Sequence, residues 1–362
     1  MTINPALVAR YGRNLASVVE INANRFIGRE IVPLQTDTIA IEPSSACNLK
    51  CSFCAYPKKD SPKISMKNDR FADYVDQAVA MGYRRFHLTP STGDIFMDRH
   101  IFDKLDFLER HPGVREYMFY TNFTISDAED TARLIELKKL KSMCISVYGH
   151  DADSFVKVAK SSHKIYLRLM RNLETLLPLV GQRPGVFHVA IRSTRDMPRG
   201  PSTDLLMMLE RYKDAGVPVK RSRLYHSWGG KIAPEDLDGL EIDVVDAKSI
   251  YKNGACSLLF TGIQIMSTGF VHACACVDVD ATLQIGDLNE QPLSEIVSTR
   301  NPLYMGLIEE QQRGLFRGVC QECSFYKSIY HSRSQYRKES IPTRSIAEFK
   351  VILDGKSPVQ AV

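Results

Sequence analysis

The sequence EPSSACNLKCSFCAY, residues 42–56, places three cysteines in the spacing C-x3-C-x2-C: Cys47, Cys51 and Cys54. Thiolates are the soft ligands that iron–sulfur clusters prefer, and a closed [4Fe–4S] cluster takes four of them. Three cysteines on one short loop can hold three irons and leave the fourth open to a small molecule. The loop directly follows an expected strand at 38–43. A zinc knuckle or three unrelated buried thiols are the alternatives, although structural zinc usually takes two CxxC-like pairs.

This cysteine pattern resembles the radical S-adenosylmethionine (SAM) superfamily, and Phe53 fits the family's aromatic residue before the third cysteine. The resemblance implies that the open iron binds the amino and carboxylate groups of SAM. Reductive cleavage of SAM would yield a 5′-deoxyadenosyl radical. A reductase such as flavodoxin or ferredoxin would be the partner that supplies the electron.

Composition narrows the class of protein. Apolar residues make up 44% of the 362 residues and the net charge is +5, which is ordinary for a globular protein and too slight for a dedicated nucleic-acid binder. No apolar run approaches the roughly 18 residues that span a bilayer, and a signal-peptide core is missing, so we expect a cytoplasmic protein without a membrane partner. In a reducing compartment the nine cysteines indicate metal ligands rather than disulfides.

Strand and helix patterns alternate from about residue 37 to 226. Expected strands are 38–43, 84–91, 116–122, 142–149, 186–194 and 217–225, and the helices between them include 68–81, 98–110, 126–138, 164–178 and 202–215. This alternation predicts parallel strands with right-handed crossovers, and six units are too few for a closed eight-stranded barrel. The expected fold is therefore α/β, an open partial (β/α)6 TIM-like barrel.

One face of the expected strands is polar. In the strand at 186–194 the apolar face would carry Phe187, Val189 and Ile191, and the opposite face His188, Ala190 and Arg192. A parallel sheet that is buried on both faces would be almost continuously hydrophobic. The polar face is therefore expected to line a ligand-filled lumen, with the chemistry at the carboxyl ends of the strands.

Several motifs at those carboxyl ends resemble the SAM-binding residues of the superfamily. The sequence Thr92-Gly93-Asp94 stands where relatives carry Gly-Gly-Glu for the SAM ammonium group, with Thr in place of the first Gly and Asp one methylene shorter than Glu. Asn122 matches a Thr-Asn-Gly motif in which Phe123 replaces the Gly, and Ser146 resembles the serine that approaches the ribose. Arg192 is the candidate for the SAM carboxylate because a guanidinium offers a bidentate fork, with Arg195 as its rival.

A second cysteine group lies near the C-terminus and resembles the SPASM/Twitch extensions of radical SAM enzymes. Ile263 to Val271 predict a hairpin that places Cys256 and Cys274 near its ends, and a helix at about 292–313 precedes Cys320 and Cys323. The resemblance implies one auxiliary [4Fe–4S] cluster on these four cysteines; a zinc ribbon is the alternative. The expected organisation is an N-terminal extension (1–36), the core (37–235), the auxiliary domain (236–326) and a tail (327–362) whose basic part forms a solvated helix or attracts a phosphorylated substrate.

Cys276 remains outside both groups. It could replace an assigned ligand, be an inert thiol, or return a hydrogen atom to a substrate radical, which would make the enzyme an epimerase. Tyr148, Tyr225 and His226 are candidate proton-handling or substrate-binding groups from their positions at strand ends.

Three functions remain open. The first is hydrogen abstraction from a sugar, aminocyclitol or nucleotide sugar, followed by dehydrogenation or epimerisation. The second is a peptide-modifying maturase, and the third is a non-catalytic iron–sulfur electron carrier or redox sensor. The short N-terminal extension and the single auxiliary cluster favour a small polar substrate.

Overall fold

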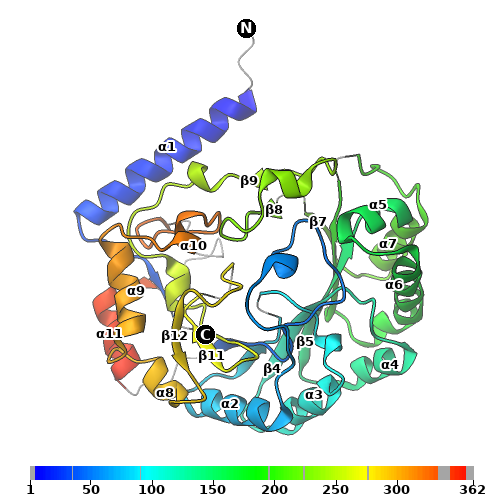
Figure 1. Ribbon diagram of the computed structural model, residues 1–362, viewed down its shortest axis with the longest axis horizontal. Helices are drawn as coiled ribbons and strands as arrows, with labels where there is room; N and C mark the ends of the chain where they lie inside the picture. Colours follow the sequence, from blue (N-terminus) through cyan, green and yellow to red (C-terminus); the bar gives the residue numbers. More distant parts are fainter. Residues whose placement is uncertain are drawn as a thin grey trace.

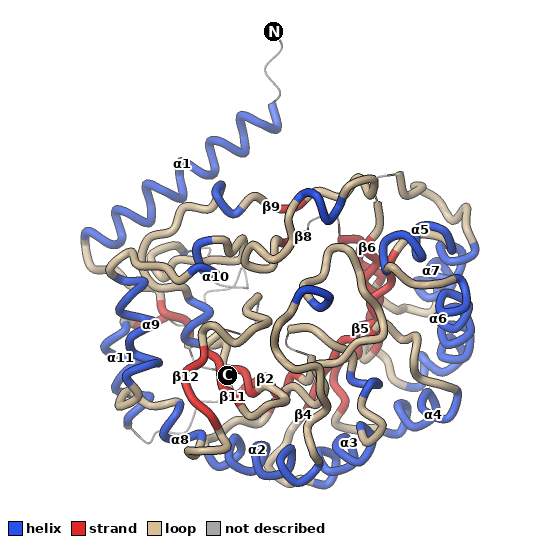
Figure 2. The backbone as a smooth tube through the Cα atoms, in the orientation of Figure 1, coloured by secondary structure: helices blue, strands red, loops and turns tan. Residues whose placement is uncertain are grey.

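The computed structural model describes residues 5–34, 36–89, 91–194, 196–222, 225–274, 277–332 and 343–355. Its centre is a nine-stranded sheet in the order β12-β11-β10-β2-β3-β4-β5-β6-β7. Six neighbouring strands are parallel: β2 (Thr38–Ile41), β3 (Arg85–His87), β4 (Glu116–Thr121), β5 (Leu140–Tyr148), β6 (Phe187–Arg192) and β7 (Val219–Ser222). All six overlap the expected strands, and the curved sheet is a partial TIM-like barrel, as predicted (Figure 2).

Helices connect these strands and cover the outer side of the sheet (Figure 1). They are α2 (Asn68–Ala80), α3 (Ile101–Arg110), α4 (Ala128–Glu136), α5 (Ala152–Ala159), α6 (His163–Leu176) and α7 (Asp204–Asp214). Helix α5 was not expected. It begins with a capping box in which Asp151 and Ser154 each accept a hydrogen bond from the other's backbone N–H.

The two faces of the barrel strands differ as the alternation predicts. Phe86, Phe119, Ile145 and Val189 on the helix-covered face are at most 1% exposed. The opposite face carries Tyr120, Cys144 and His188, which are paired in register across β4, β5 and β6. Removing the apolar face from water stabilises the fold by about 25 cal/mol per Å², so the polar face is left for the interior of the barrel.

The predicted hairpin is present and joins the barrel itself. Strands β10 (Gln264–Ile265) and β11 (Phe270–His272) are antiparallel, and β11 pairs in turn with β12 (Gln284–Asp287). Gly269 has a φ of +98° in the turn, a conformation that glycine adopts without strain. Because β10 pairs in parallel with β2, the hairpin extends the barrel sheet rather than forming a separate one.

The prediction of a single helix at 292–313 is wrong. The structure has α8 (Leu293–Ile296) and α9 (Pro302–Gln312), separated by residues without helical structure. Proline lacks a backbone N–H and is tolerated in the first turn of a helix, so Pro302 begins a new helix. Asn301 caps α9 by accepting a hydrogen bond from the backbone N–H of Leu303 at 3.0 Å. The short α10 (Gly318–Gln321) follows.

The first and last described helices lie on the same side of the molecule as α9 (Figure 1). Helix α1 (Pro5–Phe26) projects from the body (Figure 1). Strand β1 (Val32–Pro33) pairs with β13 (Thr343–Arg344), and α11 (Ile346–Asp354) packs Phe349 against Phe260. Strands β8 (Tyr225–His226) and β9 (Val244–Val245) form a small parallel pair.

The helix expected in the basic tail is absent from residues 327–331, and residues 343–344 form a strand. Ser328 forms a β-bridge with Cys256, and the carbonyl of Ile329 accepts a hydrogen bond from the N–H of Ile31. Residues 333–342 of that tail lie outside the described residues. None of the helices in the described part of the chain is both long and apolar enough to cross a membrane.

Candidate active site

The three cysteines of the first group occupy the loop that follows β2. The loop is fastened to the end of α5, because the N–H groups of Lys50 and Ser52 donate to the carbonyls of Ala159 and Val158 at 3.2 and 3.0 Å. The unexpected helix α5 therefore supports the cysteine loop. The Sγ atoms of Cys47 and Cys54 accept backbone N–H groups from Leu49 and Tyr56 at 3.5 and 3.4 Å.

These thiols fit the ligand set of an iron–sulfur cluster. Burial raises the pKa of Cys47 to about 12, with a smaller contribution from the negative charge of Asp94. Burial likewise raises the pKa of Cys51 and Cys54, and neighbouring thiolate charges raise that of Cys51 further. A positive metal centre would hold such thiols in the thiolate form, and donor atoms of this kind suit iron.

Gly93 brings the Thr92-Gly93-Asp94 loop against the cysteine loop. Its φ is +104°, and a Cβ atom there would lie 2.7 Å from the carbonyl oxygen of Ser44. The N–H of Asp94 donates to the carbonyl of Ala46 at 2.7 Å. Thr92 is buried, and its hydroxyl has no hydrogen-bond partner in the described part of the chain. The loop therefore offers an unpaired hydroxyl beside the cysteine loop.

The carboxylate of Asp94 accepts hydrogen bonds from neighbouring groups of the protein. It is 1% exposed and accepts from the N–H of Phe96 at 3.1 Å, the N–H of Asn122 at 2.7 Å and the hydroxyl of Thr121 at 2.9 Å. Burial raises its pKa despite these bonds. Being one methylene shorter than Glu, the side chain ends between its own loop and the end of β4, and its role toward SAM stays a prediction.

Asn122 faces the first cysteine. Its Nδ2 lies 3.7 Å from the Sγ of Cys47 and donates to the Oδ1 of Asn48 at 2.9 Å. Phe123, which replaces the glycine of the family motif, has a φ of +56° and is fully buried. Phe123 adopts this left-handed backbone conformation although it costs a residue with a Cβ about 1–2 kcal/mol. The backbone turn after Asn122 is therefore kept without the glycine of the family motif.

Aromatic rings and one arginine surround Phe53. The ring of Phe53 lies 5.2 Å from that of Tyr148 and 4.9 Å from that of Tyr225, and the guanidinium of Arg192 stands over it at 5.6 Å. Tyr148 and Arg192 are register partners on β5 and β6. Ser146 lies on the same strand face as Tyr148 and is 8% exposed. Tyr148, Tyr225 and Arg192 therefore gather around Phe53, the residue before Cys54.

His226 points toward the auxiliary segment instead. Its ring stacks on Phe325 with centroids 3.5 Å apart, and its Nδ1 lies 3.0 Å from the Oγ of Ser324. Burial, and to a smaller extent the charge of Arg192, lower the pKa of His226 to about 4. The neutral ring thus lies between the barrel side and the segment that follows Cys323.

The four auxiliary cysteines, Cys256, Cys274, Cys320 and Cys323, are all buried. Gln311 on α9 connects two of them, because its Nε2 donates to the Sγ of Cys320 at 3.3 Å and its Oε1 accepts from the N–H of Cys256 at 2.7 Å. Burial raises the pKa of Cys320 to about 12 and that of Cys323 to about 11; the charge of Cys274 acts in the same direction on both.

The ligand role of these four cysteines stays a prediction. Among the described residues no group of three or more His, Cys, Asp and Glu side chains is arranged to hold a single metal ion. The prediction therefore rests on the donor chemistry and on the shared burial of the thiols. Cys276 lies outside the described residues, as do Arg195 and Arg223.

Buried polar groups on the inner side of the sheet extend the site toward the hairpin. Gln264, Ala40 and His87 pair in one row across β10, β2 and β3, and His272 continues the row on β11. Lys59, which follows the cysteine loop, is 6% exposed, and its charge acts on Glu42 and His272. Among the described residues, the Lys59 Nζ and both ring nitrogens of His272 have no hydrogen-bond partner.

A cavity of about 400 Å³ adjoins Tyr225 at the carboxyl ends of β6 and β7. Its lining is largely polar or charged, with Ser193, Thr194, Arg199, Arg221, Glu241 and Asp243 beside Met197, Tyr225 and Ile242. Sequence reasoning did not assign Ser193, Lys59 or Gln311. The position of Ser193 directly after Arg192 at a strand end was the signal available, whereas Lys59 and Gln311 are recognisable only from tertiary contacts.

Family comparisons agree with this geometry. The model of the Radical SAM superfamily matches residues 41–230, and that of an iron–sulfur cluster-binding SPASM domain matches residues 256–324. Since the first match spans more than half of the chain, the protein belongs to the radical SAM superfamily. A SAM-binding [4Fe–4S] cluster and auxiliary iron–sulfur chemistry follow from the two domains. A search of curated proteins found no matching relative.

The chain resembles solved structures at low identity, and the two with a TM-score of 0.52 share its fold. SuiB of Streptococcus suis bound to precursor peptide SuiA is 15% identical, with a TM-score of 0.52 over 94% of this chain and 82% of that one. Native anSMEcpe with bound AdoMet is 15% identical, with a TM-score of 0.52 over 87% of this chain and 95% of that one. BtrN in complex with AdoMet and 2-DOIA is 14% identical, with a TM-score of 0.49 over 80% and 93%.

Proposed function

We propose that this radical SAM enzyme abstracts a hydrogen atom from a small polar substrate, such as a sugar, aminocyclitol or nucleotide sugar. Dehydrogenation or epimerisation of that substrate follows. One observation carries the proposal, namely a set of buried polar atoms that have no hydrogen-bond partner among the described residues: His87 Nε2, His188 Nδ1, Gln264 Oε1, Lys59 Nζ and His272 Nε2. Buried polar groups are nearly always hydrogen-bonded, so a hydroxylated ligand with its waters would complete them.

The SAM side of the site follows from the contacts around the cysteine loop. Cys47, Cys51 and Cys54 would hold the cluster, and Asn122 and Phe53 would flank it. Arg192 would pair with the SAM carboxylate, since a guanidinium matches a carboxylate in a bidentate fork. The hydroxyls of Thr92 and Ser146 would bind polar SAM atoms. Asp94 would act mainly by holding Asn122 and the Thr92-Gly93 loop in place.

The auxiliary side would serve the step after abstraction. Cys256, Cys274, Cys320 and Cys323 would hold the auxiliary [4Fe–4S] cluster, which when bound offers an acceptor for the electron that a dehydrogenation releases. Tyr148, Tyr225 and His226 would bind substrate or handle protons. Cys276 would return a hydrogen atom if the outcome is epimerisation. A flavodoxin- or ferredoxin-type reductase would supply the electron that starts the reaction.

The test uses anaerobically reconstituted protein, dithionite and SAM, with 5′-deoxyadenosine measured by chromatography and mass spectrometry. Candidate substrates are aminocyclitols, hexoses, nucleotide sugars and short peptides, incubated in deuterated water. A small-molecule product that has lost two hydrogens indicates dehydrogenation, and one that has gained solvent deuterium indicates epimerisation. Cys51→Ala serves as the control that cannot bind the first cluster.

Two results would overturn the proposal. A modified peptide with no change in any small molecule would make the enzyme a peptide maturase. Failure of the reduced, fully loaded protein to form 5′-deoxyadenosine would favour an electron carrier or redox sensor.

A further inference from the structure

The wall of the cavity beside Tyr225 contains a serine that is hydrogen-bonded to a buried histidine. Ser193 follows β6, is 8% exposed and lines the cavity. Its Oγ lies 2.8 Å from the Nδ1 of His150, which follows β5 and is 6% exposed. The ring of Tyr225, on the same cavity, packs 4.9 Å from Phe53. The serine therefore stands near the cysteine loop but on the cavity side.

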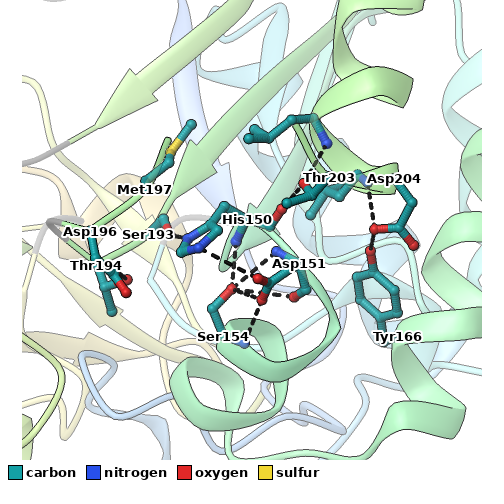
Figure 3. A network of polar contacts seen from close by, with 12 residues as sticks. His150, Asp151, Ser154, Tyr166, Ser193, Thr194, Asp196, Met197, Thr203 and Asp204 are labelled. Atoms are coloured by element: carbon teal, nitrogen blue, oxygen red, sulfur yellow. Dashed lines mark hydrogen bonds and ion pairs between the residues drawn. The ribbon is translucent and has the colours of Figure 1, made fainter. Parts of the chain in front are cut away.

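Asp151 lies on the other side of the histidine ring. Its Oδ2 is 3.5 Å from the Nε2 of His150, and its side chain is 37% exposed. The Oδ1 atom is occupied by the N–H and hydroxyl of Ser154 at 2.8 and 2.6 Å, which leaves Oδ2 for the histidine. Figure 3 shows His150 between Ser193 and Asp151. The three residues thus form a polar chain from the cavity to the solvent.

The backbone holds this chain in one geometry. Gly149 has a φ of +75°, and a Cβ atom there would lie 2.3 Å from the backbone nitrogen of Phe155. The hydroxyl of Thr203 at the start of α7 donates to the carbonyl of His150, and the N–H of His150 donates to Ser154 Oγ at 2.8 Å. Contacts from the start of α5 and from the β6–α7 connection therefore fix the backbone of His150, whose ring lies between Ser193 and Asp151.

We propose that Ser193, His150 and Asp151 form a proton relay that carries the hydroxyl proton of an alcohol substrate from the cavity to water. This inference rests on the proposed function and selects dehydrogenation as its outcome. In that reaction the carbon loses a hydrogen atom to the 5′-deoxyadenosyl radical, and the C–O bond becomes C=O. The remaining hydroxyl proton passes to Ser193 as the serine proton passes to His150, and an iron–sulfur cluster is the acceptor of the released electron.

The relay requires one histidine tautomer. Nδ1 must be unprotonated to accept from Ser193, and Nε2 must carry the proton that faces Asp151. Two-dimensional ¹H–¹⁵N spectra of the oxidised holoprotein report the tautomer of each histidine, and His150→Gln identifies the signal. The Nε2–H form is expected. The Nδ1–H form would overturn the relay, because Ser193 could then not pass its proton to the ring.

Kinetics separate a relay from a merely structural network. With the alcohol that the substrate screen identifies, Ser193→Ala and His150→Gln are expected to lower product formed per 5′-deoxyadenosine by about 100-fold, the usual contribution of positioned acid–base groups. Ser193→Thr keeps the hydroxyl and is expected to restore most of the ratio. His163→Gln is the matched control, since His163 also contacts an aspartate, Asp153, at 3.0 Å but is exposed on the surface.

The outcomes distinguish this proposal from the function on which it rests. If 5′-deoxyadenosine forms but no small molecule changes, the proposed function fails and the relay fails with it. If an oxidised product forms equally well in Ser193→Ala and the parent, only the relay is overturned. An epimerised product also overturns it, because epimerisation releases no proton.

Discussion

Replacing Asp94 with alanine tests whether this carboxylate is a structural acceptor inside the SAM loop. The change removes the acceptor for the N–H groups of Phe96 and Asn122, both of which are buried. An unsatisfied buried donor costs about 1–3 kcal/mol, so the two amides together cost about 2–6 kcal/mol. The carboxylate's own burial raises its pKa and offsets part of this. We therefore expect Asp94→Ala to lower the free energy of unfolding by about 2–4 kcal/mol.

The assay is urea unfolding of the cluster-free chain under reducing, anaerobic conditions, followed by far-ultraviolet circular dichroism. Asp103→Asn is the matched control because the Asp103 side chain is 60% exposed, and it is expected to stay within about 0.5 kcal/mol of the parent. The pKa of Asp94 is raised in the folded state, so the contribution of Asp94 to the free energy of unfolding is fully present at a pH below the ordinary pKa of aspartate. This contribution declines as the pH rises through the pKa of the folded state. The difference in unfolding free energy between the parent and Asp94→Ala should therefore become smaller as the pH rises.

An unfolding free energy for Asp94→Ala within the control range would refute this reasoning, because it would mean that the amides find other acceptors. A large loss of SAM affinity without loss of stability would point to a direct ligand role instead.

Three further predictions concern the barrel and the clusters. Burial lowers the pKa of His87 to about 4, so its contribution to stability is lost as the pH falls from 6.5 towards 4. In His87→Leu, the slope of the urea-measured free energy of unfolding against pH should be smaller in this range, by up to about 1.4 kcal/mol per pH unit. Cys323→Ser should reduce the iron bound after reconstitution by about half, since one of two four-iron clusters loses a thiolate, while Cys144→Ser leaves it unchanged; equal iron in both variants would argue against the auxiliary site. Gly149→Ala should destabilise the fold by about 3 kcal/mol, because its φ of +75° and a 2.3 Å clash leave no room, whereas Gly181→Ala, with open space around it, should behave as the parent in the same unfolding assay.

The barrel could be predicted from sequence because its strands alternate. The expected strands at 84–91, 116–122, 142–149 and 186–194 each pair an apolar face with a polar one, and this pattern is seen in the burial of Phe119 and the exposure of Tyr120. Helix α5 was missed because it is only eight residues long, yet its capping residues Asp151 and Ser154 were a readable signal. The expected helix at 292–313 is too long because Pro302 begins a separate helix, α9.

The site was less predictable than the fold because burial decides what a polar group can do. Asp94 was chosen by motif position, but its partners Thr121 and Asn122 lie 27 and 28 residues away, and no local pattern reveals that they occupy its oxygens. Lys59 belongs to a Lys58-Lys59 pair that looks like ordinary surface charge. Its neighbour Lys58 does lie at the surface against Asp236, whereas Lys59 turns inward.

Because the cysteine loop and the auxiliary hairpin adjoin the same sheet, the two cysteine groups are held at a fixed separation. Glu42, at the end of β2, accepts from the N–H and hydroxyl of Ser267 in the hairpin turn at 3.2 and 3.0 Å. On the other side, the Nε1 of Trp228 donates to the carbonyl of Phe53 at 2.9 Å, and the neighbouring Ser227 donates to the carbonyl of Glu322 at 2.9 Å. Both cysteine groups are thus tied to the barrel by strand pairing and by hydrogen bonds, of which only the one from Ser227 to Glu322 is exposed among those named here. A change in their separation would have to break the β2–β10 ladder, so substrate entry should proceed through loops such as those around Ser193 rather than by opening the sheet.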